Sequence, residues 1–359
     1  MRAAVTGANG LIGANLVRTL LRADHHVIAL VRPSSDLTSL TGLPIELRRA
    51  DVLRPDGLAE GLAGADIVFH AAAYFAYWGH SADTLETTAV TGTRNVLHCA
   101  RRVGVRRIVL TSSSVVLGSS VTPTSRDETS DNDDAAEEPP YVRAKMRQER
   151  EAFARADELG LELVAVCPTM TVGPHATSLG PSNAVIVTYL GNPLRMTYPG
   201  GCNIVAVGDV ARGHILAGEV GQPGERYLLG GENLDWATIH TTIAELAGIA
   251  RPLLTANHAG CYIAALAEEV LARLNGRKPS TSRAQAKMVG RYYWYDHAKA
   301  ARLGYAPRPA RRALAEAIAW LAASPHISRE VRSGLLLSHE VYEARRYQAG
   351  EEAQLKERR

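Results

Sequence analysis

The chain has 359 residues, of which 46% are hydrophobic and 21% charged, and its formal net charge is +3. This composition is typical of a globular protein with one large domain or two joined domains. So small a charge gives no support to a nucleic acid or a membrane as partner. The 4 cysteines are scattered without metal-binding or disulfide spacing, so we expect reduced thiols and no metal. No run is apolar enough to span a membrane, and the first apolar run is typical of a strand rather than a signal peptide, so we expect a cytoplasmic protein.

The first strong motif lies between a short apolar stretch and a segment with helical periodicity. Residues 6–13 read TGANGLIG. Strand, glycine turn and helix in this order create a helix N-terminus that can receive a pyrophosphate. Gly7 permits the turn, Gly10 lets the backbone approach the phosphates, and Gly13 lets the helix pack on the strand. The motif predicts a dinucleotide site.

Strand and helix patterns alternate through the first half of the chain. We expect strands at 2–6, 27–31, 45–51, 66–70, 107–111 and 162–166, and helices at 11–21, 56–63, 83–103 and 140–159. This alternation predicts an α/β protein with a doubly wound parallel sheet of the Rossmann type. We expect a nucleotide-binding core over 1–171 with return segments near 203–217, and a smaller, mainly substrate-binding lobe over 172–335.

Three segments break this pattern. The stretch 124–140 carries Asp127, Glu128, Asp131, Asp133, Asp134, Glu137 and Glu138. It is predicted to be a mobile, solvated loop and a candidate lid over the crevice. The apolar segment 260–274 is interrupted by charges, which favours a surface or subunit contact. The charged segment 340–359 is expected to be a frayed surface helix or disordered.

The second strong motif is Tyr141–Lys145, YVRAK. On a helix these two side chains share a face, and a nearby ammonium lowers the pKa of a phenol. The phenol can then exchange a proton with a carbonyl or alcohol oxygen. Thr111 and the serines 112–114 end the fifth strand, where a hydroxyl can hydrogen-bond that oxygen.

Together these motifs resemble the extended short-chain dehydrogenases/reductases, and the resemblance runs to about residue 322. The family's TGxxGxxG turn matches Thr6–Gly13, its HxAA segment His70–Ala73, its strand-three acidic residue Asp51 and its YxxxK motif Tyr141–Lys145. Segments 30–36, 227–233 and 303–309 most resemble the dihydroflavonol-reductase-like branch, which includes hopanoid-associated relatives.

The resemblance implies a role for each matched residue. It implies a catalytic set of Ser113, Tyr141, Lys145 and Asn95, with Ser112 or Ser114 as less favoured alternatives to Ser113. It also implies contacts to the dinucleotide from Gly7, Asn9, Gly10, Leu11, Ile12, Gly13, Arg32, Ser35, Asp51, Val52, Ala71, Ala72, Ala73, Thr111, Tyr141, Lys145, Pro168, Thr169 and Met170. Family members often pair through two helices, which here correspond to 83–103 and 140–159, so a homodimer is expected.

The end of the second strand indicates which dinucleotide is bound. A carboxylate there would accept hydrogen bonds from the adenine ribose and repel a 2′-phosphate. This chain has Arg32 with Ser34 and Ser35, and its nearest acid is Asp36. An arginine fork with hydroxyls suits a phosphate dianion, so we expect NADP(H) rather than NAD.

Two enzyme classes share these motifs: carbonyl reductases (or alcohol dehydrogenases) and nucleotide-sugar epimerases or dehydratases. The second class usually carries an arginine that grips the sugar diphosphate, and that position is Cys202 here, although Arg195 or Arg226 could substitute. The expected substrate wall is apolar, namely Tyr74, Phe75, Tyr77, Trp78, Met170, Tyr189, Leu194, Met196 and Tyr198. Substrate contacts are therefore expected from Tyr74, Trp78, Met170 and Tyr189 with Ser113 and Tyr141. We favour a reductase of a hydrophobic ketone or aldehyde; the alternatives are the sugar enzyme and a non-catalytic NADP sensor.

Overall fold

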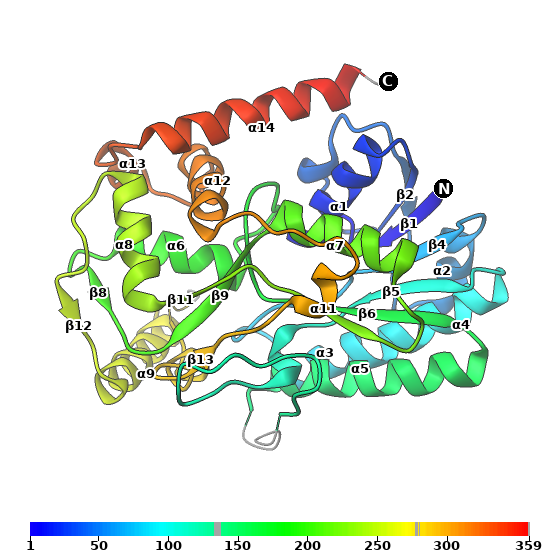
Figure 1. The fold of residues 1–359 in the computed structure, drawn as a ribbon, viewed down its shortest axis with the longest axis horizontal. Coiled ribbons are helices and arrows are strands. Elements are labelled where there is room, and N and C mark those ends of the chain that lie inside the picture. The colour runs from blue at the N-terminus through cyan, green and yellow to red at the C-terminus, as the bar shows by residue number, and fades with distance from the viewer. Residues whose placement is uncertain (133–137, 277–278, 280, 358–359) are drawn as a thin grey trace.

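The computed structural model describes residues 1–132, 138–276, 279 and 281–357. A seven-stranded, fully parallel sheet in the order β10-β6-β5-β4-β1-β2-β3 forms its centre (Figure 1). The strands are β1 Arg2–Thr6, β2 His26–Val31, β3 Glu46–Arg49, β4 Ile67–His70, β5 Arg107–Thr111, β6 Glu162–Pro168 and β10 Arg226–Leu229. The predicted doubly wound sheet is confirmed. Sequence reasoning missed β10, which joins the edge of the sheet from much later in the chain.

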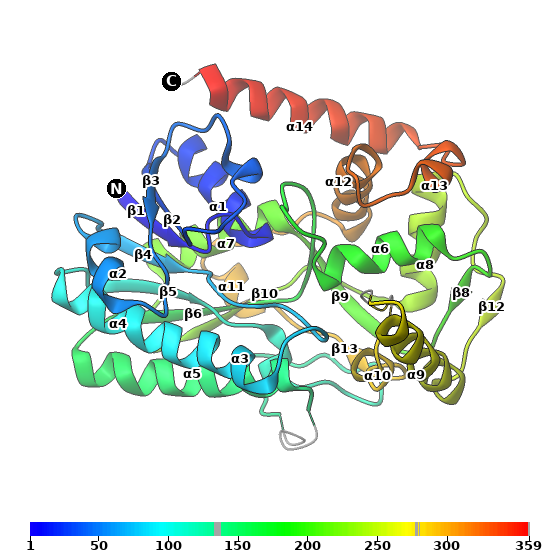
Figure 2. The ribbon, with the colours of Figure 1, turned by 180° about the vertical axis from the view of Figure 1, so that it is seen from behind.

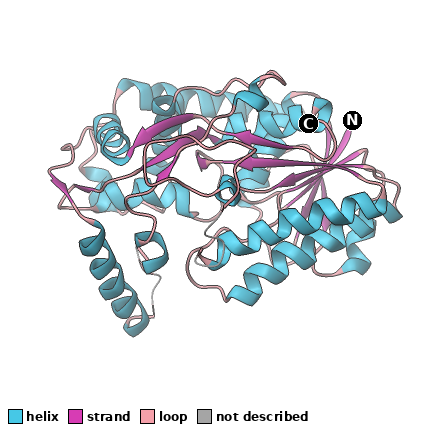
Figure 3. Cartoon of the chain, turned by 60° about the horizontal axis from the view of Figure 1, so that its bottom comes forward, coloured by secondary structure: helices cyan, strands magenta, loops and turns pink. Residues whose placement is uncertain are grey.

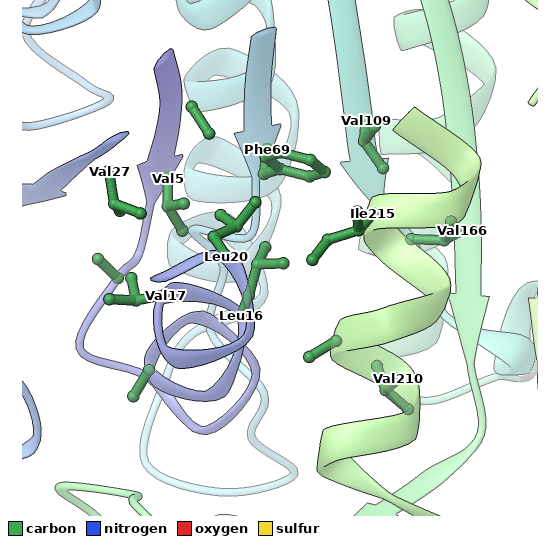
Figure 4. Packing of buried hydrophobic residues seen from close by; sticks show 14 of the residues in the cluster. Val5, Leu16, Val17, Leu20, Val27, Phe69, Val109, Val166, Val210 and Ile215 are labelled. Atoms are coloured by element: carbon green, nitrogen blue, oxygen red, sulfur yellow. The ribbon is translucent and has the colours of Figure 1, made fainter. Parts of the chain in front are cut away.

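Helices cover both faces of this sheet, as Figure 3 shows. On one face lie α1 Leu11–Arg22 and α7 Val207–Val220. Their apolar side chains interlock with those of the strands, for example Leu16 and Ile215 around Phe69 (Figure 4). On the other face lie α2 Pro55–Leu62, α4 Gly92–Arg102 and α5 Pro140–Leu159. Because the sheet is buried on both faces, its strands are continuously apolar rather than alternating.

The helix predicted over 83–103 consists of three consecutive pieces. α3 Ala82–Glu86 is followed by a π-helical turn over Thr87–Thr91 and then by α4. None of the five residues of the turn is glycine or proline, although Gly92 follows it directly, so local propensity alone did not predict it. Both α3 and the π turn pack on α5. Whether these helices form the expected dimer contact stays a prediction.

The rest of the chain builds a second layer beside the carboxyl ends of the strands (Figure 2). Its sheet runs β11-β9-β13, and β7 pairs with β9. The strands are β7 Met170–Val172, β9 Gly201–Ala206, β11 Glu232–Asp235 and β13 Tyr292–Tyr293, with a separate pair of β8 Met196–Thr197 and β12 Leu254–Thr255. The helices are α6 Pro181–Gly191, α8 Trp236–Ala247, α9 His258–Leu274, α10 Arg283–Ala286, α11 Ala298–Ala301, α12 Ala310–Ala323, α13 Arg329–Ser333 and α14 His339–Glu357, and short 3-10 turns lie at Thr38–Leu40 and Ser114–Leu117. The domain boundary at 171/172 stays a prediction.

Of the two alternatives for the charged tail, a surface helix is confirmed and disorder is wrong over the residues described there. The tail forms α14, which lies along α12 and reaches α1 (Figure 1). Leu355 is buried with the nucleotide-side core at 1% exposure, and Glu352 pairs with the buried guanidinium of Arg18 at 3.0 Å. These contacts could not be predicted from the sequence, because the tail is rich in charged residues and only a few apolar side chains along one edge anchor the helix.

The acidic loop is at least partly solvent-exposed over most of its described residues, as predicted, whereas its mobility and its role as a lid stay predictions. Hydrogen bonds hold parts of it to the rest of the fold. The backbone of Arg126 pairs with Trp294 and Asp296. The buried carboxylate of Glu128 accepts from the Leu228 amide at 2.7 Å, and Arg226 donates to the Glu128 carbonyl at 2.9 Å. These contacts fasten the first half of the loop to β10. Asp133, Asp134 and Glu137 lie outside the described residues.

Helix α9, which covers the apolar segment 260–274, lies at the surface as predicted, with Ile263 66% and Leu274 77% exposed. Whether it makes a subunit contact stays a prediction. Within the described residues, we find no helix that combines the length and the apolarity needed to span a bilayer.

Candidate active site

The turn between β1 and α1 has the shape that its glycines predict. Gly7 has a φ of +66°, and a Cβ there would lie 2.8 Å from the Cα of Ala72. A Cβ at Gly13 would lie 2.1 Å from the Gly7 carbonyl oxygen. At Gly10, however, a Cβ would meet only that oxygen, at 3.4 Å. The fold therefore requires glycine at positions 7 and 13, whereas Gly10 leaves open space in front of the α1 N-terminus.

This open space fits a dinucleotide. Asn9 precedes the first turn of α1, Leu11 and Ile12 begin that turn, and no side chain caps its backbone N–H groups. Ala71–Ala73 follow β4 directly across from the glycine turn, where the order of strands reverses. In such sheets the crevice at this reversal receives the ligand. The residues present would hold the pyrophosphate here by their backbone amides.

Basic side chains gather where β2 and β3 end. Arg32 lies at the surface and donates to the Tyr74 hydroxyl at 2.8 Å. Arg49, which the sequence analysis did not single out, donates to the carbonyl oxygens of Arg32 and Pro33 at 3.1 and 2.8 Å. The Asp36 carboxylate accepts from the Thr38 amide and hydroxyl, which lowers its pKa and turns it toward its own turn. Ser35 shares the Arg32 turn, through a backbone bond of 3.0 Å.

Asp51 and Val52 follow β3 on the same side of the crevice. Asp51 accepts from the Leu53 amide at 2.9 Å, and the Asn95 amide donates to the Val52 carbonyl at 2.9 Å. The structure thus places Asn95 against this loop, and its hydrogen bond is not to Tyr141 or Lys145. The catalytic role implied for Asn95 is not supported by this geometry; it holds the loop after β3.

The structure brings Tyr141 and Ser113 together. Tyr141 is 6% exposed, hydrogen-bonds the Ser113 side chain, and lies 5.0 Å from the ring of Phe75 and 5.6 Å from that of Tyr77. The Ser114 side chain bonds Tyr295 instead. Between these two serines, the structure favours Ser113 as the partner of the phenol.

The expectation of an acidified phenol is wrong for this structure. Burial raises the pKa of Tyr141 to about 12, and the hydrogen bond from Ser113 opposes that rise only in part. Burial also lowers the pKa of Lys145 to about 8. The Lys145 ammonium donates to the Thr111 carbonyl at 2.9 Å and to the Gln148 side-chain oxygen at 2.8 Å, rather than to the phenol. Desolvation, and not the charge one helical turn away, therefore sets the pKa of the phenol.

An apolar cavity of about 320 Å³ opens beside Ser113. Its wall includes residues from both layers, notably Phe75, Tyr77, Ser113, Pro168, Thr169, Met170, Tyr189, Met196, Tyr198, Cys202, Trp236, His240, Met288 and Tyr293. Among the described residues that line it there is no Asp, Glu, Lys or Arg. His240 is neutral as well, because burial lowers its pKa to about 4.

Not every predicted substrate residue lies in this wall. Met170 and Tyr189 do, but Tyr74 turns toward Arg32, and Trp78 packs under the Arg273 guanidinium, 5.3 Å from its ring centre. Leu194 is 58% exposed and lies outside it. Sequence reasoning missed Trp236 and His240, although their spacing of four on α8 puts both on one helical face.

The two arginines considered as substitutes at Cys202 are engaged elsewhere. Arg195 donates to the carbonyl oxygen of Leu190 at 3.1 Å. Arg226 pairs with Glu149 at 3.0 Å. Cys202 itself lines the cavity. No described side chain in the wall thus provides a positive charge for a sugar diphosphate.

The chain is similar to known proteins in sequence and in fold. The model of the NAD dependent epimerase/dehydratase family matches residues 3–230. A relative named putative dihydroflavonol 4-reductase, from Synechocystis sp., is 34% identical over 88% of this chain and 93% of its own length. Sterol demethylase protein B of Methylococcus capsulatus is 31% identical over 89% and 98%. The crystal structure of gox2253 superposes with a TM-score of 0.80 at 35% identity, covering 91% of this chain and 99% of that one.

The match spans the glycine turn, the serine segment and the Tyr141–Lys145 pair. The reductase named among the relatives agrees with the oxidoreductase chemistry that these residues can perform. The chain therefore belongs to the NAD dependent epimerase/dehydratase family, that is, to the extended short-chain dehydrogenases/reductases, and it is an NAD(P)-dependent oxidoreductase.

Proposed function

We propose that this protein is an NADPH-dependent reductase of a ketone or aldehyde on an apolar, ring-containing small molecule. The observation that carries the proposal is the uncharged, aromatic- and methionine-lined cavity beside Ser113. Such a wall favours flat apolar molecules and would leave a diphosphate without a counter-charge. The relatives named for a dihydroflavonol and a sterol support a substrate of this class.

Each residue of the site has its own role in the proposed reduction. When bound, NADPH supplies a hydride to the carbonyl carbon. Ser113 hydrogen-bonds the carbonyl oxygen and polarises it. Tyr141 donates its proton to that oxygen, and its raised pKa keeps the phenol protonated at neutral pH. Lys145 would hold the nicotinamide ribose, and its charge would stabilise the phenolate that the transfer leaves behind.

The choice of NADPH rests on the end of β2. The Arg32 guanidinium is exposed there, Arg49 holds the backbone beside it, and the nearest carboxylate, Asp36, is bound within its own turn. A 2′-phosphate would find an arginine and hydroxyls without an opposing carboxylate. Arg32→Glu should reverse the cofactor preference. A wild-type enzyme that prefers NADH would refute this part of the proposal.

The reaction class is tested by incubating the protein and NADPH with a panel of carbonyl compounds and, separately, with UDP- and GDP-sugars. The absorbance of the reduced nicotinamide monitors each reaction. A reductase consumes NADPH in a net reaction with carbonyls, whereas the alternative epimerase isomerises a sugar without net consumption. Tyr141→Phe should lower turnover by about 10²–10⁴-fold while dinucleotide binding stays within about twofold. If Tyr141→Phe changes nothing, or if only sugars react, the proposal is wrong, and a protein that binds NADPH without any turnover would be a sensor.

A further inference from the structure

Five polar side chains, all at most 4% exposed, connect the glycine turn to the active-site lysine: Thr6, His70, Thr93, Gln148 and Lys145. They come from β1, β4, α4 and α5. The Thr6 hydroxyl lies 2.8 Å from Nδ1 of His70, and Nε2 of His70 lies 2.9 Å from the Thr93 hydroxyl. The Gln148 amide donates to Thr93 at 2.7 Å, and Lys145 donates to Gln148 at 2.8 Å.

Hydrogen-bond chemistry fixes which group donates and which accepts in each bond of this network. An ammonium can only donate, so the oxygen of Gln148 faces Lys145 and its NH₂ group faces Thr93. The Thr93 hydroxyl donates to the Ala89 carbonyl at 2.6 Å and must therefore accept from both Gln148 and His70. His70 then carries its proton on Nε2 and accepts from Thr6 on Nδ1.

The charge state of His70 agrees with a single proton on Nε2. Burial lowers the pKa of His70 to about 3, and the nearby Lys145 charge acts in the same direction, so the imidazole is neutral. Thr6, having donated to His70, accepts from the Ala72 amide at 3.3 Å, beside the glycine turn. The hydroxyls of Thr6 and Thr93 and both ring nitrogens of His70 have partners within this network, and a fully satisfied buried network is rigid.

We propose that Gln148 is a positioning residue that fixes the ammonium of Lys145 and ties it, through Thr93 and His70, to the turn that receives the dinucleotide. With Thr111 and Gln148 each accepting one N–H, one of the three ammonium donors is left for a ligand in the crevice. The use of that donor in reduction rests on the proposed function, but the anchoring of Lys145 does not.

The anchoring has a measurable consequence at Lys145. Burial favours the neutral amine, and the nearby Glu149 carboxylate opposes it. The Gln148 oxygen opposes it as well, because an ammonium donates a stronger hydrogen bond than a neutral amine does. Gln148→Met removes that acceptor at similar length and should lower the pKa of Lys145 by roughly one unit. Gln148→Glu places a carboxylate there and should raise it. Thr93→Val frees the Gln148 amide and should lower it by less than Gln148→Met.

The experiment is a pH titration of the full-length protein carrying ¹³C-labelled lysine, followed at the ε-carbon by NMR. The chain has few lysines to resolve, at positions 145, 278, 287, 299 and 356. The Lys145 signal is assigned by its loss in Lys145→Arg. The matched control is Gln348→Met on α14, where the amide makes one hydrogen bond, to the Glu316 carbonyl; it should leave the Lys145 signal unchanged.

Opposite shifts in Gln148→Met and Gln148→Glu support the proposal, and an unchanged Lys145 titration in both overturns it. If Gln148→Met fails to fold, Gln148→Glu decides alone, because a carboxylate in place of the Gln148 oxygen, which lies 2.8 Å from the ammonium, should raise its pKa strongly. A second readout is kinetic: with NADPH and an accepted carbonyl, Gln148→Met should lose about 10–100-fold in kcat with little change in KM. Shifted titrations without any carbonyl reduction in the wild type would refute the proposed function and leave the role of Gln148 intact.

Discussion

Lys145 should make the folded protein less stable at neutral pH than at alkaline pH, and Lys145→Met should abolish that dependence. The ammonium is 4% exposed, and burial lowers its pKa from 10.5 to about 8. Between these two values the unfolded chain holds a proton that the folded chain has released. The free energy of unfolding contributed by this group therefore rises with pH across that window.

The size of the effect follows from the two pKa values. At pH 7 the buried charge costs about 3 kcal/mol relative to the unfolded chain, and at pH 10 about 1 kcal/mol. Tyr141 acts oppositely at higher pH, because its raised pKa makes the folded state hold its proton longer. That contribution is common to wild type and variant and cancels in their difference. The stability of Lys145→Met relative to wild type should thus fall by about 2 kcal/mol between pH 7 and pH 10.

Urea unfolding followed by circular dichroism at pH 7, 8, 9 and 10 measures this difference. The absolute offset also contains the hydrogen bonds lost at Thr111 and Gln148, so the change with pH is the quantity to compare. Lys287→Met, at an exposed position on the opposite lobe, is the control and should show no such change. A pH-independent difference for Lys145→Met would refute the view that a buried ammonium is held here at a cost.

Two further predictions concern the turn and the tail. Gly13→Ala should destabilise the fold by at least about 2 kcal/mol in urea unfolding, because its Cβ would lie 2.1 Å from the Gly7 oxygen. Gly10→Ala should keep the stability and instead weaken NADPH binding, measured by fluorescence titration, by about tenfold or more; equal effects at the two positions would contradict the assignment of Gly10 to the ligand. Leu355→Ala on α14 should lower the free energy of unfolding by about 2–4 kcal/mol, since this side chain is 1% exposed. A loss below about 0.5 kcal/mol would mean that the tail helix does not dock in solution.

Local patterns in the sequence determined most of the nucleotide-binding half. Strand periodicity, the spacing of Gly7, Gly10 and Gly13, and the Tyr141–Lys145 pair each depend on neighbours within a few residues. Backbone sterics and helix geometry act at that range, so these features could be predicted without knowing the fold. The apolar character of the substrate wall also came from local composition.

Long-range contacts decided the rest. Strand β10 pairs with β6 across 61 residues of sequence (Arg226 with Ala165), and the docking of α14 through Leu355 and the fastening of Glu128 to Leu228 join segments a hundred residues apart or more. The ionisation of Tyr141 and Lys145 was decided in the same way: adjacency on a helix predicts that the ammonium lowers the pKa of the phenol. The fold instead buries both groups, and desolvation is the largest cause of both pKa shifts. The link from Gln148 to Thr93 and His70 exists only because β4, α4 and α5 converge, which no local pattern records.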